Sequence, residues 1–125
     1  MTYLTGVDDE QLAGLYRHAW IYASPSTYEG FGLPYLEAMA CGTPVVATEN
    51  PGSVEVLEDG VYGVMPSDPD FANAVSALID DPSRRDALMA GGLRRAREFS
   101  LRRMLDAYED VLFELAEVHV NSMAA

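Results

Sequence analysis

A chain of 125 residues, 49 % of them hydrophobic, is long enough for one globular domain that buries about two thirds of its unfolded surface. The formal net charge of −12 argues against a nucleic-acid partner, since all eight cations are arginines and none lies between Arg17 and Arg84. A single cysteine excludes an internal disulfide, and no stretch approaches the roughly 20 apolar residues of a membrane span. The first residues lack the basic head and apolar run of a signal peptide, and we expect a cytoplasmic protein or one held peripherally at the inner face of a membrane.

The first half of the chain alternates helix and strand patterns. Asp8 or Asp9 is predicted to cap a helix with apolar residues at 12, 15, 16 and 19. Residues 19–24 predict a strand, and after the next helix Gly42 is typical of the position just beyond a helix end. Residues 44–48, "PVVAT", form the apolar run of a buried parallel strand. Ser53 is predicted to cap a short helix that follows this strand.

The second half is mainly helical. After a predicted strand at 61–65, Asp68 or Asp70 opens a helix, and Pro82 starts a second helix that runs to about Phe99. Glycines at 91 and 92 predict a kink in it, and the arginines at 94, 95 and 97 are interpreted as a solvated surface. Ser100 is predicted to cap a last helix with an apolar stripe. The stripe contains Leu101, Met104, Leu105, Tyr108, Val111, Leu112 and Leu115.

This order of elements predicts an α/β fold, a parallel sheet with flanking helices. About three full strands are expected, with a further strand stub at residues 2–5. That number is small for a complete doubly wound domain, so the chain reads as a partial Rossmann-like sheet, the second half of such a domain.

The segment "TYEGFGLPYLEAMACG", residues 27–42, carries the candidate site. Pro34 suits the first turn of a helix that begins near Leu33. Unpaired amides around Gly32, Leu33 and Tyr35 would then form an anion site at the helix start. Gly30 and Gly32 allow a ligand to approach the backbone. A phosphate group is the natural ligand for such a site.

Two carboxylates bracket this loop, and each allows two interpretations. Glu37, placed in the first helical turn, either complements the helix dipole or accepts hydrogen bonds from ribose hydroxyls. Glu29 is either solvated or accepts hydrogen bonds from a sugar. An acid and base pair of a glycoside hydrolase is a third reading, but an anion-binding helix start is an odd setting for a neutral glycoside.

These residues carry a family resemblance. The segment from about Gly6 to Phe99 resembles the C-terminal domain of retaining glycosyltransferases of the GT-B fold, family 4, which have two Rossmann-like domains. The resemblance rests on "LYRHAWIYASPSTYEGFGLPYLEAMACGTPVVAT", "GSVEVLEDGVYGVM" and "DDPSRRDALMAGGLRRAREFS", with the spacing Glu-x7-Glu inside the first of them.

The resemblance implies a role for each matching residue. Glu37 would bind the ribose of a nucleotide-sugar donor, and Glu29, the candidate catalytic residue, would contact hydroxyls of the transferred sugar. Transfer would proceed with retention and without a metal or other cofactor. The remaining donor-binding residues would be the backbone of Gly30, Phe31, Gly32 and Leu33 at the sugar or diphosphate, and Gly6 and Val7 at the base.

The resemblance also defines what residues 1–125 lack. Family enzymes have an N-terminal acceptor domain and a basic pair that clamps the diphosphate, and neither has a counterpart here. We therefore expect a partial C-terminal nucleotide-sugar-binding domain that needs the missing domain or a partner chain. The alternative is a non-catalytic interaction module, or one that assembles as a homo-oligomer. "NPGS" at 50–53 replaces the commoner double-glycine turn, which weakens the case for sugar contacts there.

Overall fold

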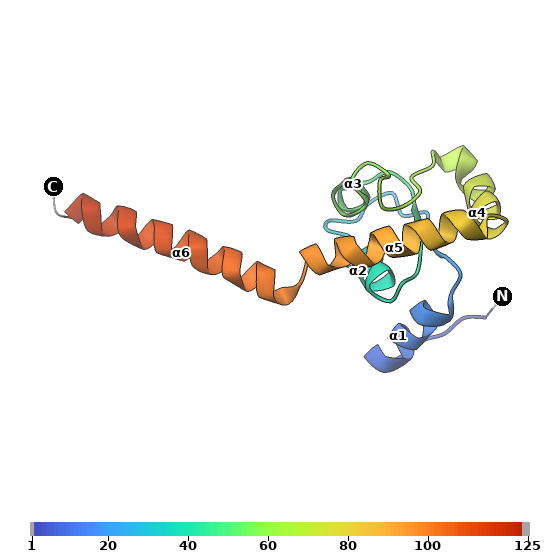
Figure 1. The fold of residues 1–125 in the computed structure, drawn as a ribbon, viewed down its shortest axis with the longest axis horizontal. Coiled ribbons are helices and arrows are strands. Elements are labelled where there is room, and N and C mark those ends of the chain that lie inside the picture. Colours follow the sequence, from blue (N-terminus) through green and yellow to red (C-terminus); the bar gives the residue numbers. More distant parts are fainter. Residues whose placement is uncertain (1, 124–125) are drawn as a thin grey trace.

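The computed structural model describes the backbone of residues 2–123 and the side chains of residues 2–116. Figure 1 shows most of the helices gathered at one end and the last helix projecting from them. The helices are α1 (Asp9–His18), α2 (Leu33–Ala40), α3 (Pro51–Leu57), α4 (Phe71–Ile79), α5 (Pro82–Glu98) and α6 (Leu101–Met123), the strands are β1 (Tyr22–Ser24) and β2 (Val45–Ala47), and a 3-10 turn, η1, spans Asp68–Asp70.

The sheet confirms the predicted α/β class. β1 and β2 pair in parallel, with Tyr22 opposite Val45 and Ser24 opposite Ala47. All of β2 is buried, as its continuous apolar run predicts. The core lies between this sheet and the helices α1, α2 and α3. Its buried residues are Tyr16, Tyr35, Leu36, Ala38, Met39, Val45, Ala47, Val56 and Leu57.

The strand predicted at 61–65 is reduced to one bridge, Val46 to Val64. The amide of Val64 donates to Val45 O and the carbonyl of Val64 accepts from Ala47 N, but the preceding amides are already used. Those of Val61 and Tyr62 donate back to Glu58 and Leu57 and close the turn after α3. Residues 2–5 also form no strand in the described part of the chain.

Helix boundaries follow the predicted caps with one exception. Asp8 caps α1 in a reciprocal pair with Gln11, and α2 ends with the amides of Gly42 and Thr43 bonded to Met39 O and Ala38 O. For α3 the prediction of Ser53 was wrong, because Asn50 is the cap. Ser53 lies one turn later, and its hydroxyl oxygen accepts a hydrogen bond from the backbone amide of Asn50.

Gly91 and Gly92 do not interrupt α5. The helix runs continuously from Pro82 to Glu98, and both glycines are buried. A Cβ atom on Gly92 would lie 3.2 Å from Cγ of Met39, and one on Gly91 would lie 3.4 Å from the Tyr62 ring. The predicted kink is therefore absent: Gly92 allows α5 to pack closely on α2, and Gly91 lies against the Tyr62 ring.

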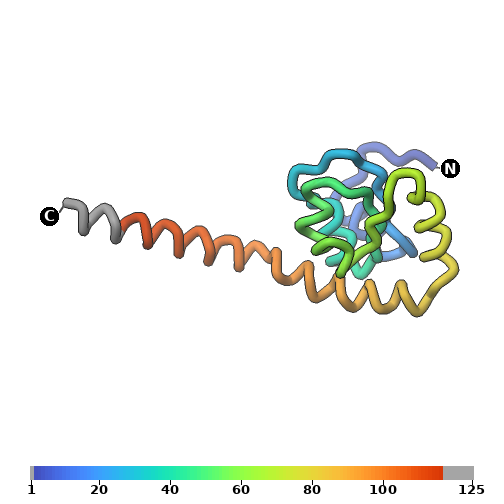
Figure 2. The backbone as a smooth tube through the Cα atoms, turned by 90° about the horizontal axis from the view of Figure 1, so that it is seen from above, coloured from blue at the N-terminus to red at the C-terminus, as the bar shows by residue number. Residues whose placement is uncertain are grey.

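α6 extends away from the other elements, and Figures 1 and 2 show this from two directions. Ser100 caps it as predicted, with its hydroxyl 3.4 Å from the Arg103 amide. The apolar stripe of α6 is exposed, with Leu112 at 64 % and Leu115 at 61 % of their full accessibility. None of the helices in the described chain combines the length and the apolar character needed to cross a membrane.

Candidate functional site

The loop between β1 and α2 leaves the sheet at the carboxyl ends of its strands, where parallel sheets bind ligands. As predicted, α2 begins at Leu33 with Pro34 in its first turn. Gly32 is the cap residue, with the left-handed φ of 83°, and its carbonyl accepts from Tyr35 N at 3.0 Å. The prediction of an unpaired Tyr35 amide was therefore wrong, because this turn already uses it. In the described chain no protein group accepts a hydrogen bond from the amides of Gly32 or Leu33. The N–H group of Leu33, an exposed residue, can therefore bind an anion, whereas Gly32 is buried and its nitrogen lies against Gly52.

The first turn of α3 holds this loop from the side. The Gly52 amide donates to Glu29 O at 2.9 Å. A Cβ atom on Gly52 would lie 2.7 Å from Gly32 N and 2.8 Å from the carbonyl carbon of Phe31. The departure at residues 50–53 argues only against sugar contacts there, and Gly52 within this segment packs against the candidate loop. The sequence signal for this contact was Gly52 directly after Pro51, because a glycine in the first turn of a helix allows another backbone to approach closely.

Asn50 fixes both ends of the loop from a buried position. Its side chain accepts a hydrogen bond from Ser53 N at 2.9 Å, and its Nδ2 group donates to Ser26 O at 3.0 Å. The same nitrogen lies 3.1 Å from both the Tyr35 hydroxyl and Thr48 O. One amide thus joins the start of the loop, the helix after it and the end of β2.

Replacing Asn50 by alanine is expected to destabilise the chain by about 2–4 kcal/mol, because a helix cap is lost and buried polar partners are left unpaired. Urea unfolding followed by circular dichroism measures this change. Asp8→Ala is the matched control, since Asp8 also caps a helix but is exposed, and it should lose only about 1 kcal/mol. Equal losses in the two variants would contradict a special role for the buried network.

Glu29 lies on the loop with its side chain half-buried. Its carbonyl is held by Gly52, while in the described chain its carboxylate accepts no hydrogen bond from a protein group. The carboxylate can therefore accept hydrogen bonds from hydroxyl groups of a ligand. Gly30 is exposed, and a Cβ atom there would meet nothing within 4 Å, so the space beside it is open.

Phe31 and Leu33 turn their side chains toward the junction of α5 and α6. The ring of Phe31 packs edge-on against Phe99, with 5.8 Å between ring centroids. Both side chains line an open hollow of about 440 Å³ with residues of that junction, among them Arg103. The backbone of these two residues rather than their side chains therefore belongs to the predicted anion site.

Glu37 is the fifth residue of α2 and not in its first turn, so the dipole interpretation loses its basis. Its exposed side chain faces α1, where the Tyr16 hydroxyl donates to Glu37 Oε2 at 3.3 Å. Glu37 lines a hollow of about 280 Å³ with Asp9, Leu12 and other residues of α1, and Glu29 does not. The structure therefore places the two carboxylates in separate surroundings.

Burial, together with the Glu37 carboxylate, raises the pKa of the Tyr16 hydroxyl, and burial also raises the pKa of Tyr22. A tyrosine whose pKa is raised by folding stabilises the fold below the unfolded value of about 10, and this stability is lost as the pH rises above it. Tyr16→Phe should therefore make the stability less dependent on pH between about 9 and 12, as urea unfolding would measure. Tyr28→Phe, at an exposed position, should leave the dependence unchanged.

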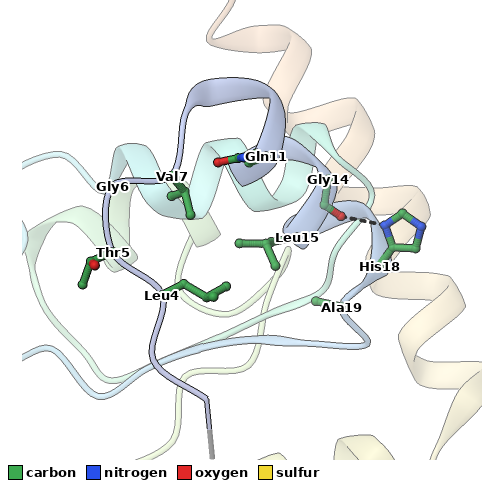
Figure 3. A pocket seen from close by; sticks show the side chains of 9 residues that line it. All are labelled: Leu4, Thr5, Gly6, Val7, Gln11, Gly14, Leu15, His18 and Ala19. Carbon is green, nitrogen blue, oxygen red and sulfur yellow. Dashed lines mark hydrogen bonds between the residues drawn. The ribbon is translucent and has the colours of Figure 1, made fainter.

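Gly6 and Val7 line a different hollow, of about 830 Å³, on the side of α1 that faces the N-terminal segment. Figure 3 shows Val7, Leu4 and Leu15 pointing into the same space. His18 stays at its rim, with Nδ1 2.7 Å from Gly14 O. Its mainly apolar lining can pack against the face of a flat ring.

A further hollow, of about 300 Å³, lies directly beyond the ends of β1 and β2 and was not predicted. Thr27 and Thr48 line it, and Thr48 fixes the loop by donating from Oγ1 to Ser26 O at 2.7 Å. Within the described residues no group of His, Cys, Asp and Glu is arranged to hold a metal ion.

Residues 1–95 match a family model described as "Glycosyl transferases group 1". Among curated proteins, O-antigen chain mannosyltransferase B of Escherichia coli is 43 % identical over 99 residues, covering 78 % of this chain and 26 % of that protein. D-inositol 3-phosphate glycosyltransferase 1 of Catenulispora acidiphila is 43 % identical over 99 residues, covering 77 % and 24 %. A D-inositol 3-phosphate glycosyltransferase of Thermomonospora curvata is 42 % identical over 120 residues, covering 91 % and 27 %. The chain thus spans about a quarter of the length of these relatives.

Proposed function

The chain belongs to the glycosyl transferases group 1 family, and from this premise we propose that residues 1–125 form the donor-binding part of a retaining glycosyltransferase of the GT-B fold, family 4. The enzyme would transfer a sugar from a nucleotide-diphosphate sugar to an acceptor. Residues 1–125 would be the second half of its C-terminal domain, and an N-terminal domain or a partner chain would supply the acceptor site. The proposal places the enzyme in the cytoplasm or peripherally at the inner face of a membrane.

The observation that carries the proposal is the unpaired, exposed amide of Leu33 at the start of α2, in the same loop as the unpaired carboxylate of Glu29. In the reaction the bond from the anomeric carbon to the diphosphate breaks, and the nucleoside diphosphate leaves with the bonding electrons. The acceptor oxygen forms the new bond to the anomeric carbon, and its proton passes to the leaving diphosphate. N–H groups at a helix start stabilise the charge that develops on this leaving group. Glu29 would hold the sugar by its hydroxyls, so that the anomeric carbon faces the acceptor oxygen.

Glu37 would bind the ribose hydroxyls, and the resemblance implies that Gly6 and Val7 border the base. The hollow at Glu37 is lined by residues 9, 12, 13 and 16 of α1, and the hollow at Gly6 by residues 11, 14, 15 and 18 on the opposite face, so one nucleoside does not fill both. The relatives' names differ in what is transferred or modified, since one specifies mannosyl transfer and others name D-inositol 3-phosphate. The sugar and the acceptor therefore have to be identified by experiment.

The first test is a titration of the isotope-labelled chain with UDP-, GDP- and ADP-sugars, a mannosyl donor included, followed by NMR. We expect saturable shifts of the Gly30, Gly32 and Leu33 amides with one of the three nucleotides. Unchanged spectra with all three would contradict a donor site in this chain. A sugar-transfer assay on the same chain should show no turnover, and robust turnover would contradict its assignment as part of an enzyme.

The exposed apolar stripe of α6 favours a second candidate, a non-catalytic module that binds another protein or a second copy of itself. A stable dimer in sedimentation that binds none of the three nucleotide sugars would support this candidate. Leu112→Glu, which places a charge in the stripe, should then return the chain to the monomer. If the wild-type chain is a monomer and binds a nucleotide sugar, it is not a self-assembling module.

A further inference from the structure

Arg95 is not part of the solvated surface that the sequence predicts for residues 94–97. Arg94 and Arg97 are exposed as expected, but the Arg95 side chain keeps only 16 % of its accessibility. It lies in the last turns of α5, and its guanidinium reaches across to α3 and to the aromatic residues that follow both helices. A buried cation of this kind is held by several partners at once.

Two of the polar partners of Arg95 lie at the end of α3, and the third is Glu98 of α5 itself. Its Nε group donates to Val56 O at 3.2 Å, and its Nη2 group donates to Glu55 O at 2.8 Å. Nη1 forms an ion pair with Glu98 at 2.7 Å. The last carbonyls of a helix have no partner within the helix, and an arginine satisfies them while complementing the negative end of the dipole. Arg95 thus joins α3 to α5.

The apolar face of the same guanidinium stacks on two rings. Its central carbon lies 4.7 Å from the centroid of Phe99 and 5.4 Å from that of Tyr62. Such contacts stabilise a cation that is withdrawn from water. Phe99 in turn packs edge-on against Phe31, which belongs to the candidate donor loop.

Two chains of contact therefore run from Arg95 to residues 29–33. One passes through α3, whose far end places the Gly52 amide on Glu29 O, and the other passes through Phe99 to Phe31. We propose that Arg95 is a positioning residue that holds the loop of Glu29 and the Leu33 amide in the geometry that receives the donor. The donor part of this inference rests on the proposed function, while the link to the loop is a property of the chain itself.

The link is tested on the free chain by hydrogen exchange of single amides. The Gly52 amide reports on the loop, because it donates to Glu29 O, and the amides of Ala47 and Val64 report on the sheet. Arg95→Met, which keeps the stem and removes the guanidinium, should speed exchange at Gly52 by about tenfold relative to Ala47 and Val64. Arg94→Met, at the exposed neighbouring position, should change none of the three.

Phe99→Leu removes the ring between Arg95 and Phe31 and leaves Arg95 in place, so it should also speed exchange at Gly52, by a smaller factor. Unchanged exchange at Gly52 in Arg95→Met would overturn the proposal. An equal increase at all three amides would also overturn it, because Arg95 would then stabilise the whole fold and not the loop.

A titration with the nucleotide sugar that shifts the wild-type spectrum tests the consequence for the donor. Arg95→Met should still bind this nucleotide sugar saturably, with a dissociation constant raised by about five- to tenfold. Arg94→Met should leave the dissociation constant unchanged. Unchanged affinity together with faster exchange at Gly52 would overturn the positioning role for the donor. If the wild-type chain binds no nucleotide sugar, the proposed function fails, and the exchange experiment still decides the role of Arg95 in the loop.

Discussion

Replacing Glu37 by alanine is expected to weaken nucleotide-sugar binding by roughly 10- to 100-fold. A carboxylate that accepts hydrogen bonds from two ribose hydroxyls contributes about 1.5–3 kcal/mol in total, and every 1.4 kcal/mol is a factor of ten in affinity. The fold should tolerate the change, because Glu37 is exposed and its protein partner is the Tyr16 hydroxyl at 3.3 Å. Calorimetric titration with the nucleotide sugar measures the loss, and circular dichroism confirms that the variant is folded.

Glu109→Ala is the matched control, since Glu109 is an exposed carboxylate on α6, away from the proposed site. It removes the same charge and should leave the affinity unchanged. Tyr16→Phe removes the hydroxyl that donates to Glu37 and keeps the carboxylate. It should weaken nucleotide-sugar binding only slightly, because Tyr16 orients Glu37 and does not itself contact the ribose. Wild-type affinity in Glu37→Ala would mean that the ribose lies elsewhere.

The location of Glu37 illustrates what sequence alone could predict. Pro34 and Gly42 correctly predicted the ends of α2, because their backbone preferences act within a few residues. The sequence did not predict that Glu37 would face α1 while Glu29 lies against α3, since this depends on how the helices pack. The spacing of Glu29 and Glu37 along the chain therefore identified the candidate carboxylates, but it did not predict that they lie in different surroundings in the fold.

Other failures have equally specific causes. The strand at 61–65 has the composition of a strand, yet two of its amides close the turn after α3 and only Val64 reaches β2. Ser53 is a good cap residue, but Asn50 occupies the cap and its amide group also meets the loop. Arg95 has the sequence surroundings of a surface arginine, and only its contacts with α3 reveal that its side chain is mostly covered. Each of these outcomes depends on tertiary contacts that no local pattern contains.

The second large effect is expected at Gly32, where alanine should destabilise the chain by about 2–4 kcal/mol. A left-handed backbone costs a residue with a Cβ atom about 1–2 kcal/mol, and forcing an atom into a packed site costs a further 1–3 kcal/mol. Both apply, since φ is 83° and the new Cβ atom would lie 2.5 Å from the buried Tyr35 ring and 3.2 Å from Gly52 O. Urea unfolding measures the loss.

Gly30→Ala, two residues earlier in the same loop, is the control that separates stability from binding. Its Cβ atom would meet nothing within 4 Å, so the unfolding curve should match that of the wild type. If a nucleotide sugar approaches the loop backbone as proposed, the methyl group will occupy ligand space and weaken binding without loss of stability. Two results would contradict this account of the loop: a Gly32→Ala chain as stable as the wild type would show that the left-handed turn is not required, and a Gly30→Ala chain with full affinity would place the donor away from this backbone.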